Sequence, residues 1–174
     1  LCGLWCLANA ALDLAVLEVG LGGRLDAVNI IDADVAIVTT IAQDHANFLG
    51  NDLAQIGREK AGIFRAGKPA VLGSQTLPAS VAGCAQSLAA PTFTLGQQFD
   101  HQTMGEETAT WRWQGQRSDG KCFTIDELAD PGLPIDNAAT ALQALVLAET
   151  KLIPAHVREG LATVQLAGRL QWIG

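Results

Sequence analysis

The chain has 174 residues and a mass of 18.2 kDa, the size of one ordinary domain. Hydrophobic residues make up 49% of it and charged residues 17%, a balance that excludes an intrinsically disordered protein. Its 18 acidic and 11 basic side chains give a net charge of −7, which argues against a nucleic-acid partner because phosphate neutralisation needs lysine and arginine. Phosphate groups would have to be bound locally, by a metal ion, backbone amides or a few cations.

The opening twenty residues are apolar, but they do not have the pattern of a signal peptide or a membrane span. No basic segment precedes them, and Asp13 and Glu18 interrupt the apolar run. We therefore expect no membrane partner. The first residue is leucine, so we expect the chain to be an internal piece of a longer protein.

The cysteines indicate a reducing compartment, and we expect a cytoplasmic protein. None of the four has the spacing of a zinc site or of a redox pair. Two of them stand four residues apart in an apolar stretch, so we expect both to pack in the core of a helical segment. The four are Cys2, Cys6, Cys84 and Cys122.

The first half of the chain alternates between predicted strands and helices, which is typical of βαβ units. Short apolar runs predict buried strands of a parallel sheet; they span residues 14–19, 34–40, 68–74 and 91–95. A helix is predicted over 52–65, with Asp52 as its N-cap and Gly67 as its stop, and an alanine-rich helix over 78–89.

The second half changes character at residue 97. Alternating polar and apolar residues over 97–126 predict two or three antiparallel strands at the margin of the sheet; turn signals stand at Gly105, Gly115 and 118–120. Helices are predicted over 136–150 and from Pro154 to about Val164, and a last strand over 170–174. The fold class is α/β, a mostly parallel sheet with flanking helices and a small antiparallel section.

Two candidate metal ligands stand at the ends of neighbouring predicted strands. Glu18 ends the first strand and His45 follows the second, so both lie at the edge where open α/β sheets bind ligands. A carboxylate and an imidazole can share a metal ion, and Asp44 would then orient the ring or cap a turn. The alternative for Glu18 is an ion pair with Arg24, and the sequence leaves the two open.

Lys60 lies on the apolar face of the first predicted helix, between Ile56 and Phe64. Gly57 and Gly62 leave space for a ligand or another backbone. Burial would favour the neutral, reactive amine of the lysine. The alternative is a lysine whose stem packs on apolar surface while its charge reaches water.

Two further residues are uninformative by themselves. Asn137 begins a predicted helix and is most simply its N-terminal cap, and Arg169 is any surface cation.

Five segments follow one another in an order that is typical of one protein family. They are EVGLGGRLDAVN (18–29), TTIAQDH (39–45), IGREKAGIFRAGKP (56–69), DNAATALQAL (136–145) and AGRLQ (167–171). Together they closely resemble the central domain of folylpolyglutamate synthase/dihydrofolate synthase, the folate-pathway members of the Mur ligase superfamily. The resemblance covers nearly the whole chain.

The resemblance implies an ADP-forming ligase that uses ATP and Mg²⁺. ATP phosphorylates a folate or dihydropteroate carboxylate, and the amine of L-glutamate attacks the acyl phosphate. The implied partners are these small molecules, and we expect a monomer. Positioning and charge neutralisation dominate phosphoryl transfer, so a metal and an arginine suit it.

The resemblance also implies a role for each candidate residue. Glu18 and His45 match Mg²⁺ ligands, and Leu25, Asp26 and Ala27 match part of the pteroate-binding loop. Lys60 matches a lysine that is carbamylated in the family and, with His45, is assigned to catalysis. Asn137 and Arg169 match residues that hold ATP.

The chain departs from the family pattern in the segments that it lacks. No G-x-x-x-x-G-K-[ST] phosphate loop occurs in it. We therefore expect residues 1–174 to be a piece of the central ATP-binding domain, without its phosphate-loop segment or the C-terminal domain, and to be inactive in isolation. The alternatives are a Mur-type ligase for another substrate, such as a peptidoglycan amino-acid ligase, and a non-catalytic nucleotide-binding module.

Overall fold

A computed structural model describes residues 2–42, 52–104 and 110–165. The chain divides into two compact units. The first comprises residues 1–70 and 76–92, and the second comprises residues 71–75 and 93–174. His45, Arg169, Gly105 and the strand expected over 170–174 lie outside the described residues.

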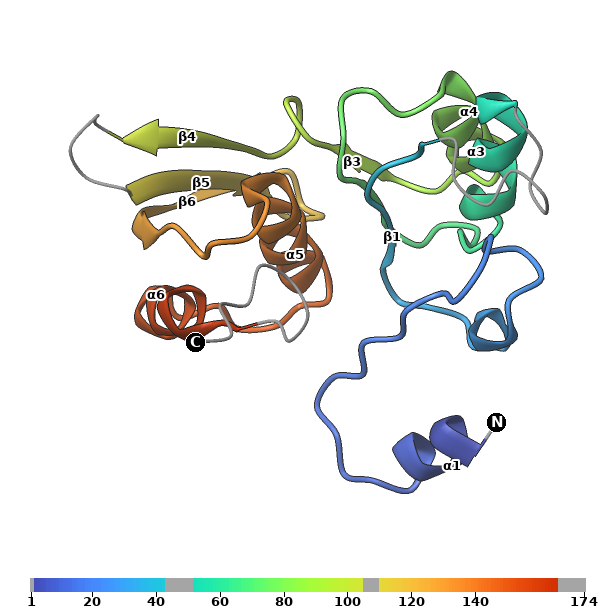
Figure 1. The fold of residues 1–174 in the computed structure, drawn as a ribbon, viewed down its shortest axis with the longest axis horizontal. Helices are drawn as coiled ribbons and strands as arrows, with labels where there is room; N and C mark the ends of the chain where they lie inside the picture. Colours follow the sequence, from blue (N-terminus) through green and yellow to red (C-terminus); the bar gives the residue numbers. More distant parts are fainter. Residues whose placement is uncertain (1, 43–51, 105–109, 166–174) are drawn as a thin grey trace, which may run out of the picture. The chain divides into compact units, whose positions relative to one another are not determined.

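Three of the four predicted parallel strands are present. They form a sheet of order β1-β2-β3, with β1 at Ala36–Val38, β2 at Ala70–Leu72 and β3 at Thr92–Thr94 (Figure 1). All three residues of β2 are buried, which agrees with a continuous apolar run in the middle of a sheet. Each strand is shorter than its apolar run because only the residues that pair with neighbours are strand.

The fourth prediction, a buried strand over 14–19, is wrong. These residues have no regular structure, and Val16 is 85% exposed. An apolar run becomes a buried strand only where a neighbouring strand accepts its hydrogen bonds, and none in the described residues pairs with it. The cysteine interpretation is wrong as well, because Cys2 and Cys6 are exposed on a short helix, α1 (Cys2–Ala8), with no buried residue.

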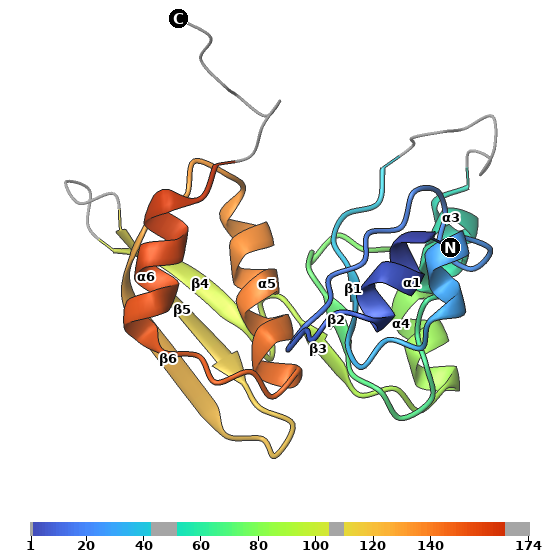
Figure 2. The same ribbon diagram turned by 90° about the horizontal axis from the view of Figure 1, so that it is seen from below.

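Two helices of the first unit, α3 (Leu53–Ala61) and α4 (Ala79–Ser87), pack against each other (Figure 2). The Asp52 carboxylate accepts a hydrogen bond from the Ala54 amide at 2.9 Å, so the predicted N-cap of α3 is confirmed. The predicted stop at Gly67 is wrong. The helix ends at Ala61 and Gly62 is its C-cap, whereas Gly67 has a φ of +69° in a later turn.

The second unit holds a separate antiparallel sheet, so the prediction that these strands extend the margin of the first sheet is wrong. Its order is β4-β5-β6, and α5 and α6 lie on one of its faces (Figure 2). Trp111 and Trp113 of the central strand are almost fully buried. The elements are β4 (Asp100–Met104), β5 (Thr110–Gln116), β6 (Cys122–Ala129), α5 (Ile135–Leu147) and α6 (Pro154–Thr163).

The turn signals of this region have different outcomes. The turn at 118–120 is confirmed: the Arg117 amide donates to the Lys121 carbonyl at 2.9 Å, and Gly120 has a φ of +83°. The expected turn at Gly115 is wrong, because this glycine lies inside β5. A side chain there would collide with the Trp113 ring and the Gln143 amide, so glycine is needed for packing and not for a turn.

Candidate functional site

The candidate site in the first unit is a loop of residues 20–31 that is shaped by its own aspartate. The Asp26 carboxylate accepts hydrogen bonds from the amides of Val28, Leu21 and Gly20 at 3.0–3.1 Å. It thereby caps the 3₁₀ turn η1 (Ala27–Ile30). These backbone N–H groups, that of Val28 first, hold the pKa of Asp26 below its ordinary value.

This 20–31 loop is packed directly on the backbone of the last turn of α3. A Cβ atom built on Gly23 would lie 2.7 Å from the Glu59 carbonyl oxygen and 2.8 Å from that of Lys60. A Cβ atom on Gly62 would likewise lie 2.7 Å from the Cα of Arg24. The loop and the end of the helix therefore each carry a glycine at the point where the backbone of the other segment passes.

Polar bonds hold the same two segments together. The Arg24 amide donates to the Glu59 carbonyl at 2.9 Å, and the Arg24 Nε donates to the Glu59 carboxylate oxygens at 3.1 and 3.3 Å. The Asn29 side chain donates to the carbonyls of Arg24 and Gly62 at 3.0 and 3.1 Å. The loop that carries residues 25–27 and the helix that carries Lys60 are thus a single packed substructure.

These contacts decide the alternative interpretation of Glu18. Arg24 pairs with Glu59, so the alternative Glu18–Arg24 ion pair is not formed. Glu18 is exposed, and within the described parts of the chain no hydrogen bond or ion pair occupies its carboxylate. An unengaged carboxylate is a ligand of the kind Mg²⁺ prefers. No group of three or more His, Cys, Asp or Glu side chains that could hold a metal ion occurs among the described residues.

The remaining candidates of the first unit differ in how accessible they are. Leu25 is 79% exposed and Ala27 is exposed, so both can contact a ligand. The Asp26 carboxylate is engaged within the loop and acts there on loop shape. Lys60 is half-buried in the last turn of α3, so its environment is less enclosed than the sequence pattern indicates.

In the second unit, Asn137 lies in the first turn of α5, as expected for a residue near a helix N-terminus. The interpretation as the N-cap is wrong, since the helix begins at Ile135 and Pro134 precedes it as the cap. The Asn137 amide donates to the Pro134 carbonyl at 3.0 Å, and its side chain is exposed. Its neighbour Asp136 accepts a hydrogen bond from His101 Nε2 at 2.7 Å.

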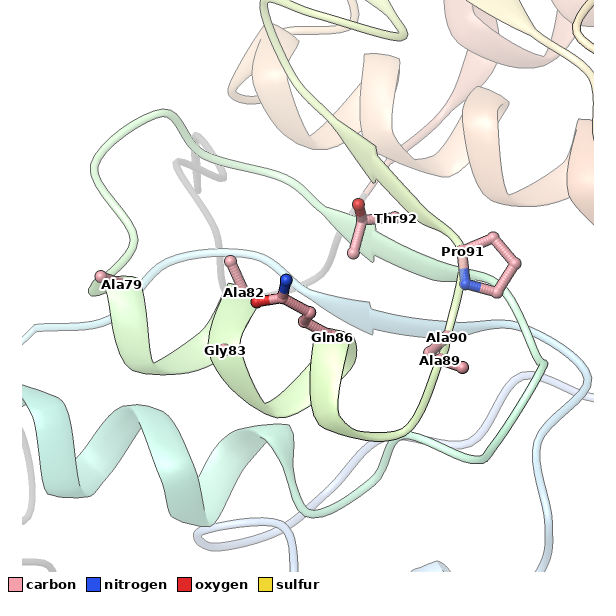
Figure 3. A pocket seen from close by; sticks show the side chains of 8 residues that line it. All are labelled: Ala79, Ala82, Gly83, Gln86, Ala89, Ala90, Pro91 and Thr92. Carbon is pink, nitrogen blue, oxygen red and sulfur yellow. The ribbon is translucent and has the colours of Figure 1, made fainter.

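A shallow hollow on the first unit lies apart from these motifs. Figure 3 shows it along α4, lined mainly by alanine, glycine and proline together with Gln86 and Thr92. Its lining contains no charged side chain. We assign it no part in phosphate or metal binding, because both need charge or convergent polar groups.

Sequence reasoning did not find the residues that join loop and helix. Glu59, Asn29 and Arg65 lie inside the family motifs but were given no role. Their partners in the other segment are 33 to 36 residues away in the chain, beyond the reach of any local pattern. The sequence feature that could have indicated this contact is the presence of two short motifs that combine glycine with a charged residue, GGR (22–24) and KAG (60–62).

Curated proteins and solved structures were compared with the chain, and no protein-family model matches it. The dihydrofolate synthase/folylpolyglutamate synthase of Escherichia coli is 43% identical over 171 residues, covering 98% of this chain and 39% of that protein. The folylpolyglutamate synthase of Lacticaseibacillus casei is 34% identical over 188 residues, covering 98% and 41%.

Among solved structures, the Yersinia pestis bifunctional folylpolyglutamate synthase/dihydrofolate synthase with Mn, AMPPNP and L-glutamate bound has a TM-score of 0.85 at 42% identity. That match covers 98% of this chain and 40% of the other. E. coli FolC in complex with DHPP and ADP has a TM-score of 0.79 at 43% identity, with 90% and 36% covered.

The chain spans about two fifths of the length of the curated relatives it matches. The match extends over nearly all of its own residues and includes both sheets. The chain therefore belongs to the folylpolyglutamate synthase/dihydrofolate synthase family, as the resemblance of its motifs predicted.

Proposed function

We propose that the protein is an ATP- and Mg²⁺-dependent ligase that joins L-glutamate to a folate or dihydropteroate carboxylate. The γ-phosphoryl group of ATP passes to the carboxylate, the glutamate amine attacks the resulting acyl phosphate, and ADP and phosphate are released. The observation that carries this proposal is the packing of the 20–31 loop on the last turn of α3. It places the segment implied in pteroate binding against the backbone of Lys60.

Each candidate residue has a proposed part in this reaction. Glu18, together with His45, would hold Mg²⁺, which neutralises charge on the phosphates when it is bound. Leu25 and Ala27 would contact the pteroate, and Asp26 would keep their loop in shape. Asn137 and Arg169 would hold ATP, Asn137 through its amide and Arg169 through its positive charge.

Lys60 is the proposed site of carbamylation. Its neutral amine adds to carbon dioxide and loses a proton, which replaces a cation by an anion. That anion would stand beside the site of the Mg²⁺-nucleotide, where negative charge holds the metal or orients the incoming amine. We expect Lys60→Ala to lose turnover in the full-length protein and to regain part of it when short carboxylic acids are added.

A matched lysine controls this experiment. Lys68 belongs to the same unit and pairs with Asp34 at 2.9 Å on the surface. Lys68→Ala should therefore leave turnover within about twofold, because exposed ion pairs contribute little. Wild-type turnover by Lys60→Ala without added acid would contradict the carbamylation proposal.

The proposed activity is tested by the substrate it needs. Full-length protein is incubated with ATP, Mg²⁺ and labelled glutamate, with dihydropteroate, reduced folate or a peptidoglycan-precursor carboxylate in separate reactions. We expect label in the pteroate or folate product and stoichiometric ADP. Label only in the peptidoglycan product would indicate another Mur-type ligase. Nucleotide binding without ADP formation would indicate a non-catalytic module.

We further propose that residues 1–174 belong to the ATP-binding domain and that the protein acts as a cytoplasmic monomer. The absence of a helix long and apolar enough to cross a membrane, within the described residues, is compatible with this. Light scattering of the purified full-length protein, with and without nucleotide, gives its molecular mass. A mass of two or more chains would contradict the monomer.

A further inference from the structure

Arg65 binds the two segments of the candidate site at once. Its Nη2 donates to the backbone and side-chain oxygens of Asn29 at 2.7 and 3.0 Å, and its Nε pairs with the Asp32 carboxylate. Its Nη1 donates to the carbonyls of Ile63 and Phe64 at 3.1 and 3.2 Å. One side chain, 25% exposed, thus joins the end of the 20–31 loop to the chain that leaves α3.

The chemistry of this junction requires a guanidinium. The carbonyls just after α3 have no partners within the helix, and a cation near a helix C-terminus is favourable. The planar guanidinium of arginine carries its donors on three nitrogens, so it can bind acceptors in both segments at the same time. Lysine has a single donor nitrogen and cannot reach both sets of acceptors. Asn29 extends the junction, because its amide donates to both Arg24 and Gly62.

We propose that Arg65 is a positioning residue that fixes the 20–31 loop against the last turn of α3 and so sets where residues 25–27 stand relative to Lys60. The inference rests on the proposed function for its kinetic consequence. It concerns the pteroate or folate side of the reaction, because the groups that Arg65 binds lie in or directly after the loop, at Asn29 and Asp32, and directly after α3. A misplacement of about 1 Å can lower a rate by about a hundredfold.

Kinetics of the full-length Arg65→Lys protein test the proposal, with Asn29→Ala as a second variant of the same junction. We expect each variant to raise the KM for the pteroate or folate substrate and to lower kcat, so that kcat/KM for this substrate falls by about tenfold or more. The KM for ATP should stay within about twofold. The combined variant should lose little more than either alone, because both remove one junction. A loss that is equal for both substrates, or fully additive, would overturn the proposal.

Arg58 provides the matched control. It is an arginine in the last turn of α3, 56% exposed, and it approaches the Asp52 carboxylate only to 3.8 Å. Arg58→Lys should leave both KM values within about twofold. A loss as large in Arg58→Lys as in Arg65→Lys would show that any arginine near the end of α3 matters and would overturn the specific role of Arg65.

Hydrogen–deuterium exchange separates this inference from the proposed function. In Arg65→Lys, peptides that cover residues 20–31 should exchange faster, while β4–β6 stays protected as in the parent. Faster exchange together with an inactive parent protein would retain the junction and refute the ligase. Unchanged exchange in a folded variant would refute the junction whatever the activity.

Discussion

Replacing Gly23 by alanine tests whether the 20–31 loop is fitted to the last turn of α3. The added methyl would lie 2.7 and 2.8 Å from two backbone carbonyl oxygens and 3.0 Å from the Cα of Lys60, whereas ordinary contact begins at 3.4 Å. Backbone atoms cannot rotate away as a side chain end can. The loop must therefore retreat from the helix.

The expected loss of stability follows from the contacts that would weaken when the loop moves away from the helix. Forcing a methyl into a packed site costs about 1–3 kcal/mol. Loss of the hydrogen bond from the Arg24 amide to the Glu59 carbonyl, 2.9 Å long, adds about 1 kcal/mol. The Arg24–Glu59 ion pair adds little, because the Arg24 side chain is 55% exposed. We expect a local destabilisation of about 2–4 kcal/mol.

Amide exchange of the full-length protein measures this, with Gly83→Ala as the control. Gly83 lies inside α4, where no atom within 4 Å would meet a Cβ, so alanine should stabilise that helix by about 0.5–1 kcal/mol. In Gly23→Ala the Arg24 amide should exchange about thirtyfold faster or more, the equivalent of 2 kcal/mol. A Gly23→Ala protein whose 20–31 loop is as protected as the parent's would refute the packing argument.

Three further predictions follow from particular residues. Ala89 has a φ of +50° just after α4, so Ala89→Gly should raise the free energy of unfolding by about 1 kcal/mol, whereas Ala82→Gly within α4 should lower it by about as much, as thermal unfolding would show. Backbone N–H donors lower the pKa of Asp26, so the stability that its carboxylate contributes is present above the ordinary pKa of 3.8 and is lost only as the pH falls through the lower folded-state pKa. The NMR shifts of the amides in the 20–31 loop should therefore stay constant down to that pH range. A change in these shifts at pH 5 would contradict this. The buried Gln143 amide accepts from the Gln116 amide at 3.1 Å and donates to its carbonyl at 2.7 Å, so Gln143→Leu should lower stability to urea by about 2 kcal/mol, and an unchanged midpoint would contradict the role.

Local chemistry was predictable from the sequence wherever a few adjacent residues decide the structure. Asp52 caps α3 because its side chain reaches an amide two residues on, and the turn at 118–120 depends on its own glycine. The β2 strand is likewise visible as an apolar run bounded by proline and glycine. These features depend little on distant parts of the chain.

Features that depend on distant partners could not be predicted in this way. The run at 14–19 has the composition of a strand, but strand structure requires a neighbour to receive its hydrogen bonds. Gly115 has the appearance of a turn residue, yet its absence of a side chain serves the packing of Trp113 and Gln143. The partner of Arg24 could likewise not be identified from the sequence, which offered the nearer Glu18 as one alternative, because Glu59 lies 35 residues away.

The packing of the loop on the helix gives a physical reason why the two motifs occur together. Gly23 admits the backbone of the last turn of α3, and Gly62 admits the backbone of Arg24, so each glycine is required by the other segment. Two arginines then join the segments. Arg24 of the loop binds Glu59 of the helix, and Arg65, which follows the helix, binds Asn29 of the loop. A substitution in either motif therefore acts on both. If the protein is the proposed ligase, whose chemistry is mainly positioning, this coupling places residues 25–27 and Lys60 under one structural constraint.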